Sequence, residues 1–235
     1  MADKSGTARN LLLARLPRSD FKRLQARLEP VPLLHRQILG DVGEPVQYVL
    51  FPLQGVVSLL TVTDGSAIEV GLLGAEGMLG LPLVFGAAVS PWRLLVQAPG
   101  EALQLPADEV KTELARRGPF QDLLLRYASA VFVQTGQLAA CNALHSVKQR
   151  CCRWLLTMQE RAHANVFPMT QEFLAEMLGV RRASVAEVAG LLQRTGLIHS
   201  SRGTITILNR RGIEALACDC HRLARAEYDR LLPPV

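Results

Sequence analysis

The segment from residue 169 to residue 192, MTQEFLAEMLGVRRASVAEVAGLL, constrains the fold of this chain more than any other stretch. Thr170 is a good helix N-cap, because its hydroxyl can accept a hydrogen bond from the backbone of the following turn. Gly179 tolerates the positive φ of a sharp turn, so a first helix is expected to end there. Val185 and Leu192 lie seven residues apart, on one face of a second helix. The segment therefore predicts two short helices joined by a tight turn, the helix-turn-helix motif.

A β-ribbon is predicted directly after this motif, because TGLIHSSRGTITIL has the pattern of a strand, a polar tip and a return strand. Such a ribbon is a wing, and it completes a winged helix. In this motif the first turn of the second helix enters the major groove of DNA, where arginine can bond guanine or phosphate. An αα-hairpin with a ribbon used only for packing is the structural alternative. The predicted DNA-contacting residues are Thr170, Gln171, Arg181, Arg182, Ala183, Ser184, Glu187, Ser201, Arg202 and Gly203.

The excess positive charge lies in the part of the chain that contains this motif. Residues 1–140 carry 13 Lys and Arg against 13 Asp and Glu, whereas residues 141–235 carry 13 against 8. A local basic surface on an otherwise neutral chain favours a polyanionic partner, although an ordinary solvated surface has the same composition. Glu187 either accepts from a cytosine amino group or pairs with Arg182 or Arg194. The six arginines near this single acid are Arg181, Arg182, Arg194, Arg202, Arg210 and Arg211.

The N-terminal half has a different pattern, with short apolar runs between turn signals over residues 35–105. Residues 63–66, TDGS, carry the Asp-Gly pair of a tight hairpin. Many short strands at close spacing predict an antiparallel β-roll. This region holds two basic residues and six acids, so we do not expect it to bind DNA. An amphipathic helix is predicted over residues 10–29, where prolines end it.

Helices are predicted to connect the roll to the winged helix. A short helix over residues 107–117 stops at Gly118, and a longer one follows. Seven of its residues are spaced alternately by four and three, the pattern of two helices that pack along their length. We expect this seam to form a homodimer, with packing against its own chain as the alternative. A further helix is predicted over residues 145–162. The seam residues are Phe120, Leu124, Tyr127, Val131, Gln134, Leu138 and Cys141.

Several classes of protein are not expected from the sequence. No stretch approaches the roughly 18 uncharged apolar residues of a membrane span, and the N-terminal apolar run is too short for a signal peptide. We therefore expect a cytoplasmic protein. Five cysteines, all after residue 140, are not typical of a secreted disulfide framework. A phosphate-binding loop, a nucleophile elbow and an H-E-x-x-H motif are all absent, so we do not expect an enzyme.

A β-roll, a long seam helix and a C-terminal winged helix, in this order, resemble the Crp/Fnr family of bacterial transcription regulators. The resemblance is most specific in TQEFLAEMLGVRRASVAEVAGLLQRTGLI, and FPLQGVVSLL and GAEGMLG are consistent with it. It implies an α+β fold with a sensory, cyclic-nucleotide-binding-like roll over residues 1–118, a dimerisation helix and hinge over 119–144, and a winged helix over 145–235. It also implies a homodimer that binds a palindromic operator, works with RNA polymerase and senses an effector through the roll. No cofactor is expected.

The resemblance also implies where an effector would bind. Family members that bind cyclic AMP have a Gly-Glu-Leu turn for the ribose and an Arg-Ser pair for the phosphate. Residues 77–82 here contain no acid, and Arg93 is followed by leucine. One misplaced arginine would leave the cyclic phosphate poorly paired, so we expect another small ligand or none. A cyclic-nucleotide-responsive regulator is the alternative. The candidate pocket residues are Gly77, Gly80, Leu81, Arg93, Gly136 and Gln137.

The cysteines raise two further questions. No cysteine precedes Cys141, so the iron–sulfur cluster of some family members is not expected. Cys141 would face its twin in a parallel dimer, which makes a redox-responsive cross-link an alternative to a small buried residue. Cys218, Cys220 and His221 supply at most three metal ligands, fewer than a structural zinc site requires. We therefore predict no metal site.

Overall fold

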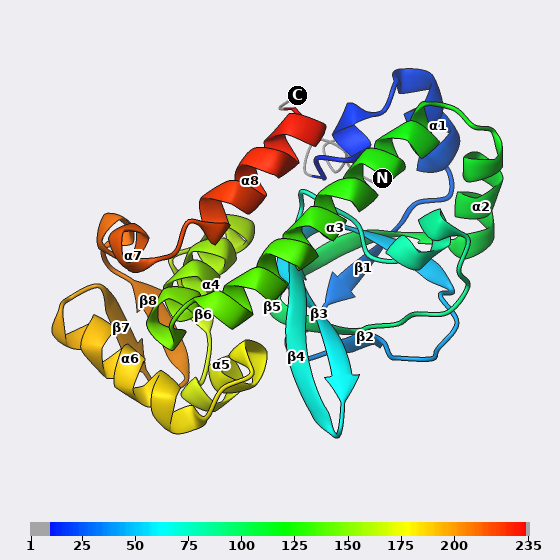
Figure 1. Ribbon diagram of the computed structural model, residues 1–235. Coiled ribbons are helices and arrows are strands. Elements are labelled where there is room, and N and C mark those ends of the chain that lie inside the picture. Colours follow the sequence, from blue (N-terminus) through cyan, green and yellow to red (C-terminus); the bar gives the residue numbers. More distant parts are fainter. Residues whose placement is uncertain (1–9, 234–235) are drawn as a thin grey trace.

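The computed structural model describes residues 10–233 and consists of two parts joined by two long helices (Figure 1). The N-terminal part is a β-roll with flanking helices, and the C-terminal part is a smaller unit of helices and a short sheet. Within residues 10–233, no helix combines the length and apolar character needed to cross a membrane.

The roll is built on a five-stranded antiparallel sheet with the order β1-β5-β3-β4, in which β2 also pairs with β5. Asp64 and Gly65 join β3 to β4 with φ values of 49° and 74°, so the predicted Asp-Gly hairpin is confirmed. A short 3-10 helix, η3, covers one side of the roll. The bounds are β1 Glu29–Leu33, β2 Ile38–Gly40, β3 Tyr48–Thr63, β4 Ser66–Leu73, η3 Leu81–Phe85 and β5 Arg93–Pro106.

The single helix predicted over residues 10–29 is wrong. The structure has a 3-10 turn, η2 (Leu13–Arg15), and a separate helix, α1 (Arg18–Gln25). The break comes at Leu16, whose ψ is 142°, because the ring of Pro17 disfavours the helical conformation in the residue before it. Strand β1 also begins at Glu29, inside the predicted helix.

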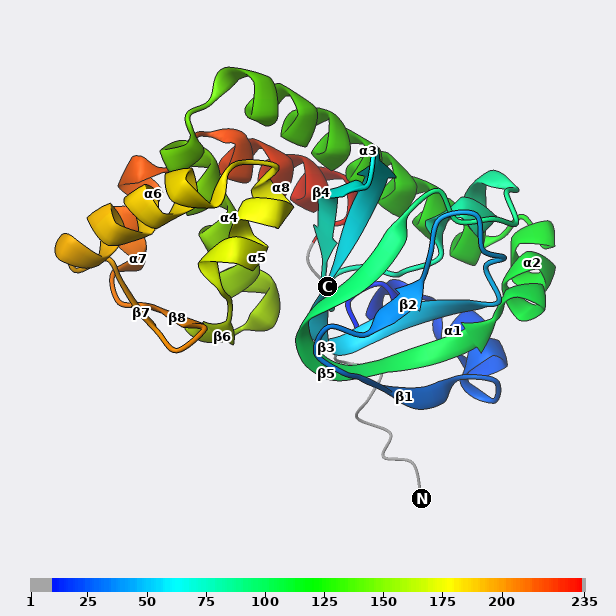
Figure 2. The same cartoon turned by 90° about the horizontal axis from the view of Figure 1, so that it is seen from below.

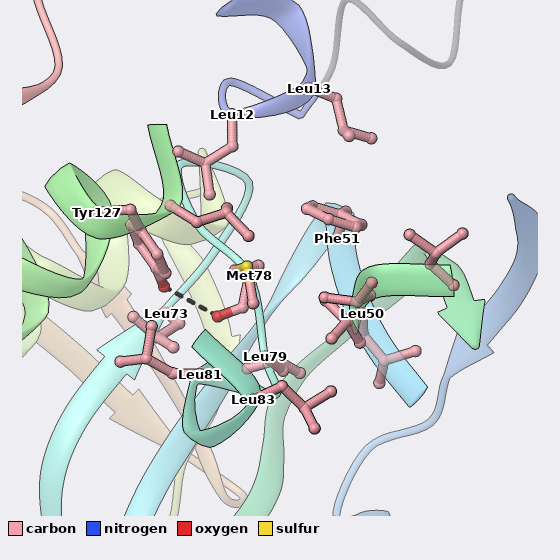
Figure 3. Close-up of a cluster of buried hydrophobic side chains, with 14 of the residues drawn as sticks. Leu12, Leu13, Leu50, Phe51, Leu73, Met78, Leu79, Leu81, Leu83 and Tyr127 are labelled. Atoms are coloured by element: carbon pink, nitrogen blue, oxygen red, sulfur yellow. Dashed lines mark hydrogen bonds between the residues drawn. The ribbon is translucent and has the colours of Figure 1, made fainter. Parts of the chain in front are cut away.

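Helix α3 is anchored in the roll by Tyr127. Figure 3 shows its side chain among the buried leucines, with the hydroxyl donating to the carbonyl of Met78 at 2.9 Å. A Cβ on Gly77 would lie 2.4 Å from this hydroxyl oxygen, so only glycine fits there. Burial raises the pKa of Tyr127 well above its usual value, so the phenol stays a donor. The predicted helices before the winged helix are confirmed as α2 Ala107–Ala115, α3 Pro119–Leu144 and α4 Val147–Ala162.

The C-terminal part is a winged helix, as predicted. Its three-stranded antiparallel sheet has the order β6-β8-β7, and β6 is a strand that the sequence analysis did not predict. The last helix, α8, leaves this part and runs back along α3 to the roll (Figure 1). The remaining bounds are β6 Val166–Pro168, α5 Gln171–Leu178, α6 Arg182–Arg194, β7 Ile198–Ser201, β8 Thr204–Ile207, α7 Arg210–Leu216 and α8 Cys220–Leu231.

The two parts share a buried core. Val56, Leu60 and Leu72 of the roll belong to the same hydrophobic cluster as Leu155 of α4. Helix α5 lies next to the edge strand β4, as both views show (Figures 1 and 2). The winged helix is therefore packed against the roll, and a movement between the two would have to open this core.

A buried polar network crosses the same boundary. Glu69 of β4 accepts hydrogen bonds from the hydroxyl of Ser58 at 2.6 Å and from Nε1 of Trp154 at 3.1 Å. Gln97 donates to the Ser58 hydroxyl at 2.8 Å. Burial raises the pKa of Glu69, and the two hydrogen bonds only partly oppose this. The network thus holds α4 against the sheet through a titratable group.

Candidate nucleic-acid interface

The helix-turn-helix is built by the residues that predicted it. The hydroxyl of Thr170 accepts from the backbone N–H of Phe173 at 3.1 Å and caps α5. Gly179 ends α5 with a φ of 61°. Val185 and Leu192 of α6 are fully buried, so the opposite face of this helix is the one open to solvent.

The first turn of α6 is open and basic. Arg181, Arg182 and Ala183 are exposed, and Ser184 is half-buried. The backbone N–H groups at the start of a helix have no partner within it, and the helix dipole makes this end positive. The two arginines and this helix end together form a donor-rich, positive surface, which suits phosphate oxygens or the guanine edge.

The wing tip lies beside the start of α5. Arg202 and Gly203 have φ values of 48° and 76° and form the two-residue turn between β7 and β8. The N–H of Met169 donates to the carbonyl of Gly203 at 2.7 Å. The structure therefore brings together Thr170, Arg202 and Gly203, all exposed, with Ser201 and Gln171 adjacent in sequence.

The charges divide the arginines of this region into two groups. Arg210 is bound to Glu160 and to Glu214, so it supports α7 and is not available to a partner. In the part of the chain that the structure describes, Glu187 forms no salt bridge with Arg182 or Arg194, which leaves its carboxylate exposed. The other five arginines also form no ion pair within residues 10–233: Arg181, Arg182, Arg194, Arg202 and Arg211.

These features agree with a comparison against known families, in which residues 149–216 match the model of the Crp-like helix-turn-helix domain. The chain carries a Crp-like helix-turn-helix domain on a Crp/Fnr-type fold. The resemblance to the Crp/Fnr family is thereby confirmed for the helix-turn-helix domain and for the fold. No curated protein matches the chain.

Solved structures share the fold over most of the chain. Their sequence identities to this chain are low, so the similarity concerns the fold only. A protein from Eubacterium rectale described as a transcriptional regulator of the Crp/Fnr family has a TM-score of 0.69 and 21% identity, over 87% of this chain and 96% of that one. The c-di-GMP-responsive global regulator CLP from Xanthomonas campestris has a TM-score of 0.66 and 19% identity, over 81% and 99%. FixK2 from Bradyrhizobium japonicum has a TM-score of 0.69 and 15% identity, over 81% and 98%.

The predicted seam of α3 lies inside the protomer of this Crp/Fnr-type fold. Apart from Gln134, each of its side chains is at most 8% exposed, because the seam packs against the roll and α8. Gln134 is half-buried and accepts from Arg161 of the same chain at 2.9 Å. This burial favours the alternative interpretation, that the seam packs against its own chain. The residues concerned are Phe120, Leu124, Tyr127, Val131, Gln134, Leu138 and Cys141.

Cys141 at the end of this seam is fully buried and faces Cys218, with 3.5 Å between the two sulfur atoms. Cys141 of a second chain therefore cannot reach this sulfur to form a cross-link. The alternating spacing of four and three thus identified a packed face correctly, but the spacing does not say which surface the face packs against.

The roll of the Crp/Fnr-type fold contains a cavity of about 630 Å³, and only some of the predicted effector-pocket residues line it. Gly80 and Leu81 line it, together with residues that the sequence did not single out, such as Glu44 and Trp92. Arg93 does not line it. Its Nε and Nη2 donate to the carboxylate of Asp41 at 3.0 and 2.8 Å, which lowers the pKa of Asp41.

The other three predicted pocket residues lie elsewhere. Gly77 packs under Tyr127, and Gly136 is on the exposed face of α3. Gln137 lines a separate cavity of about 440 Å³ between α3, α4 and α8. This second cavity was missed because the position of α8 depends on contacts between distant segments.

Proposed function

We propose that this chain is a homodimeric, sequence-specific DNA-binding transcription regulator of the cytoplasm, with RNA polymerase as its further partner. The observation that carries the proposal is the exposed first turn of α6, where Arg181 and Arg182 have no acidic partner within the described residues. This turn belongs to a Crp-like helix-turn-helix domain.

In this proposal α6 enters the major groove with its N-terminal end. Arg182 bonds guanine or a phosphate, and Ser184 adds a polar contact. Glu187 lies five residues further along α6, exposed and without an ion pair in the described chain, so it is free to accept from a cytosine amino group. Arg202 at the wing tip and Thr170 with Gln171 at the start of α5 meet the phosphate backbone on the flank.

The homodimer forms through the exposed face of α3, opposite the buried seam. Leu125 and Phe132 are 46% and 79% exposed there. The face follows the same spacing of four and three, but it is shifted by five residues, and the small side chains beside the two apolar ones let a second helix approach closely. The proposed contact residues are Leu125, Ser129, Phe132, Gly136, Ala139 and Ala143. A symmetric pair of this kind presents two α6 helices to a palindromic operator.

In this proposal the roll cavity binds an effector, but it does not bind a cyclic nucleotide in the usual mode. A cyclic phosphate needs a cation, and within residues 10–233 the lining of this cavity contains the acid Glu44 and no Lys or Arg. Arg93, the nearest sequence candidate, is paired with Asp41. An uncharged or cationic small molecule fits this lining best.

The test is DNA binding by the full chain to a duplex selected from a random library, measured by fluorescence anisotropy across a salt series. We expect nanomolar-range binding whose logarithm falls linearly with the logarithm of salt, since arginines displace counterions from phosphates. The variant Arg181→Ala is expected to reduce the slope, and Arg18→Ala, an exposed arginine of α1, serves as the matched control. No selected sequence, or a salt-independent affinity, would overturn the proposal.

A further inference from the structure

Four potential metal ligands from distant parts of the chain meet where α3 ends and α8 begins. Cys141 and His145 lie four residues apart at the end of α3, and Cys218 and Cys220 lie at the start of α8. The sulfur of Cys141 is 3.5 Å from that of Cys218, and the sulfur of Cys220 is 3.5 Å from Nδ1 of His145. All four ligand atoms lie within 4.8 Å of one another.

This cluster differs from the one that the sequence indicated. His221, which follows Cys220 directly, points to Glu160, with 3.0 Å between Nε2 and the carboxylate oxygen. The fold replaces it with Cys141 and His145, which are 77 and 75 residues away from their partners in the cluster. The count of potential ligands thus rises from three to the four that a structural zinc site requires.

We propose that Cys141, His145, Cys218 and Cys220 bind a soft divalent cation, zinc, and that this ion fastens α8 to the end of α3.

The spacing of the ligand atoms fits a tetrahedral ion. With Zn–S and Zn–N bonds of about 2.3 and 2.0 Å, a tetrahedron has edges of about 3.8 Å between sulfurs and about 3.5 Å between sulfur and nitrogen. The two distances of 3.5 Å lie within a few tenths of these edges. The widest pair of ligand atoms has to close by no more than about 1 Å. Side-chain rotation alone is sufficient for that change.

The positive charge around the cluster favours a zinc–thiolate complex, which is an anion. Three thiolates and one neutral imidazole around Zn²⁺ carry one net negative charge. Arg150 and Arg153 of α4 are only 9% and 6% exposed and form no salt bridge within residues 10–233. Nη2 of Arg150 donates to the carbonyl of Leu178, but Nε of each arginine has no partner there. Both guanidinium groups interact electrostatically with the Cys141 thiol. A buried cation without a counter-charge is costly, and the metal–thiolate cluster supplies that counter-charge.

Hydrogen-bond donors also face the sulfur atoms. Nε2 of Gln137 lies 3.1 Å from the sulfur of Cys220 and donates to it. The backbone of Cys220 hydrogen-bonds the Cys218 thiol. Donors that surround ligating groups in this way orient them and are typical of metal centres.

A disulfide between Cys141 and Cys218 is the competing reading of the same contact. It would use two of the four groups, and it would leave Cys220 and His145 outside the cross-link. The metal accounts for all four side chains.

The test is the metal content of the full chain, purified in reducing buffer from zinc-supplemented medium. We expect one zinc per chain by mass spectrometry of the metal, and tetrahedral thiolate absorption bands after Co²⁺ exchange. His145→Asn and Cys220→Ser are expected to weaken zinc binding at least about tenfold in competition with a chromophoric chelator. The matched controls, His221→Asn and Cys151→Ala, keep wild-type affinity because neither residue belongs to the cluster.

Three results would overturn this proposal. The first is a wild-type protein that is folded by circular dichroism and holds no zinc. The second is equal zinc affinity in His145→Asn and His221→Asn. The third is a wild-type chain two mass units lighter than the reduced protein, with Cys141 joined to Cys218. The Co²⁺ spectrum and the stoichiometry of the wild-type protein decide the matter even where a cysteine variant does not fold.

Discussion

Truncation of Phe132 tests the proposed dimer face directly. Phe132 is 79% exposed in the protomer, so Phe132→Ala removes little that stabilises the single chain. In a two-fold dimer both copies of the ring become buried. Full burial of such a side chain contributes about 1.5–3 kcal/mol, so the pair contributes about 3–6 kcal/mol. The dimer dissociation constant is therefore expected to rise by about 10² to 10⁴-fold.

Sedimentation equilibrium over a concentration series measures this change. Phe85→Ala is the matched control, because Phe85 is 62% exposed and belongs to η3 rather than to α3. The thermal unfolding of the two variants is expected to agree at concentrations where both are monomers. If Phe132→Ala and Phe85→Ala dimerise with the same constant as the wild type, the assignment of this face is wrong.

Three further predictions concern the stability of the chain, and the first two test contacts that hold the winged helix to the roll. Because the pKa of Glu69 is raised, its contribution to stability is present below the usual value of 4.5 and is lost as pH rises through the raised pKa. Glu69→Gln keeps an oxygen that accepts from Ser58 and Trp154, so the variant is expected to remove this loss of stability. Urea unfolding at acidic and neutral pH measures the difference. Gly179→Ala is expected to destabilise the chain by about 1–2 kcal/mol, because its φ is 61° and the new Cβ would lie 3.2 Å from Ile68 of β4. Gly190→Ala, inside α6 and near only the flexible end of Arg194, is expected to stabilise it by about 0.5–1 kcal/mol; thermal unfolding of both variants with the same sign would contradict the reasoning.

Features that depend on neighbouring residues could be predicted from the sequence. Thr170 and Gly179 set the ends of α5 through local hydrogen bonds and a positive φ, and both do so in the structure. Asp64 and Gly65 fix the β3–β4 turn in the same way. Pro17 could have predicted the break between η2 and α1, but the helical spacing of the leucines around it favoured one continuous helix.

Features that depend on distant partners could not be predicted. Arg93 meets Asp41 across 52 residues, and nothing in the local sequence shows that this arginine is already paired. The seam of α3 has the spacing of a packed helix whether its partner is a second chain or its own roll. The cysteine cluster needs α8 to return to α3, and only the tertiary structure places Cys141 beside Cys218.

The central claim is that the first turn of α6 reads DNA bases, and the measurement that tests it most directly is a specificity profile of Arg182→Ala. Affinities of the wild type and the variant are compared on the selected operator and on each of its single base-pair substitutions. The proposal predicts that the variant loses about 1–3 kcal/mol of discrimination at one base pair in each half-site, with the other positions unchanged. A variant that keeps wild-type specificity, whether its affinity is unchanged or falls equally on every sequence, would contradict it.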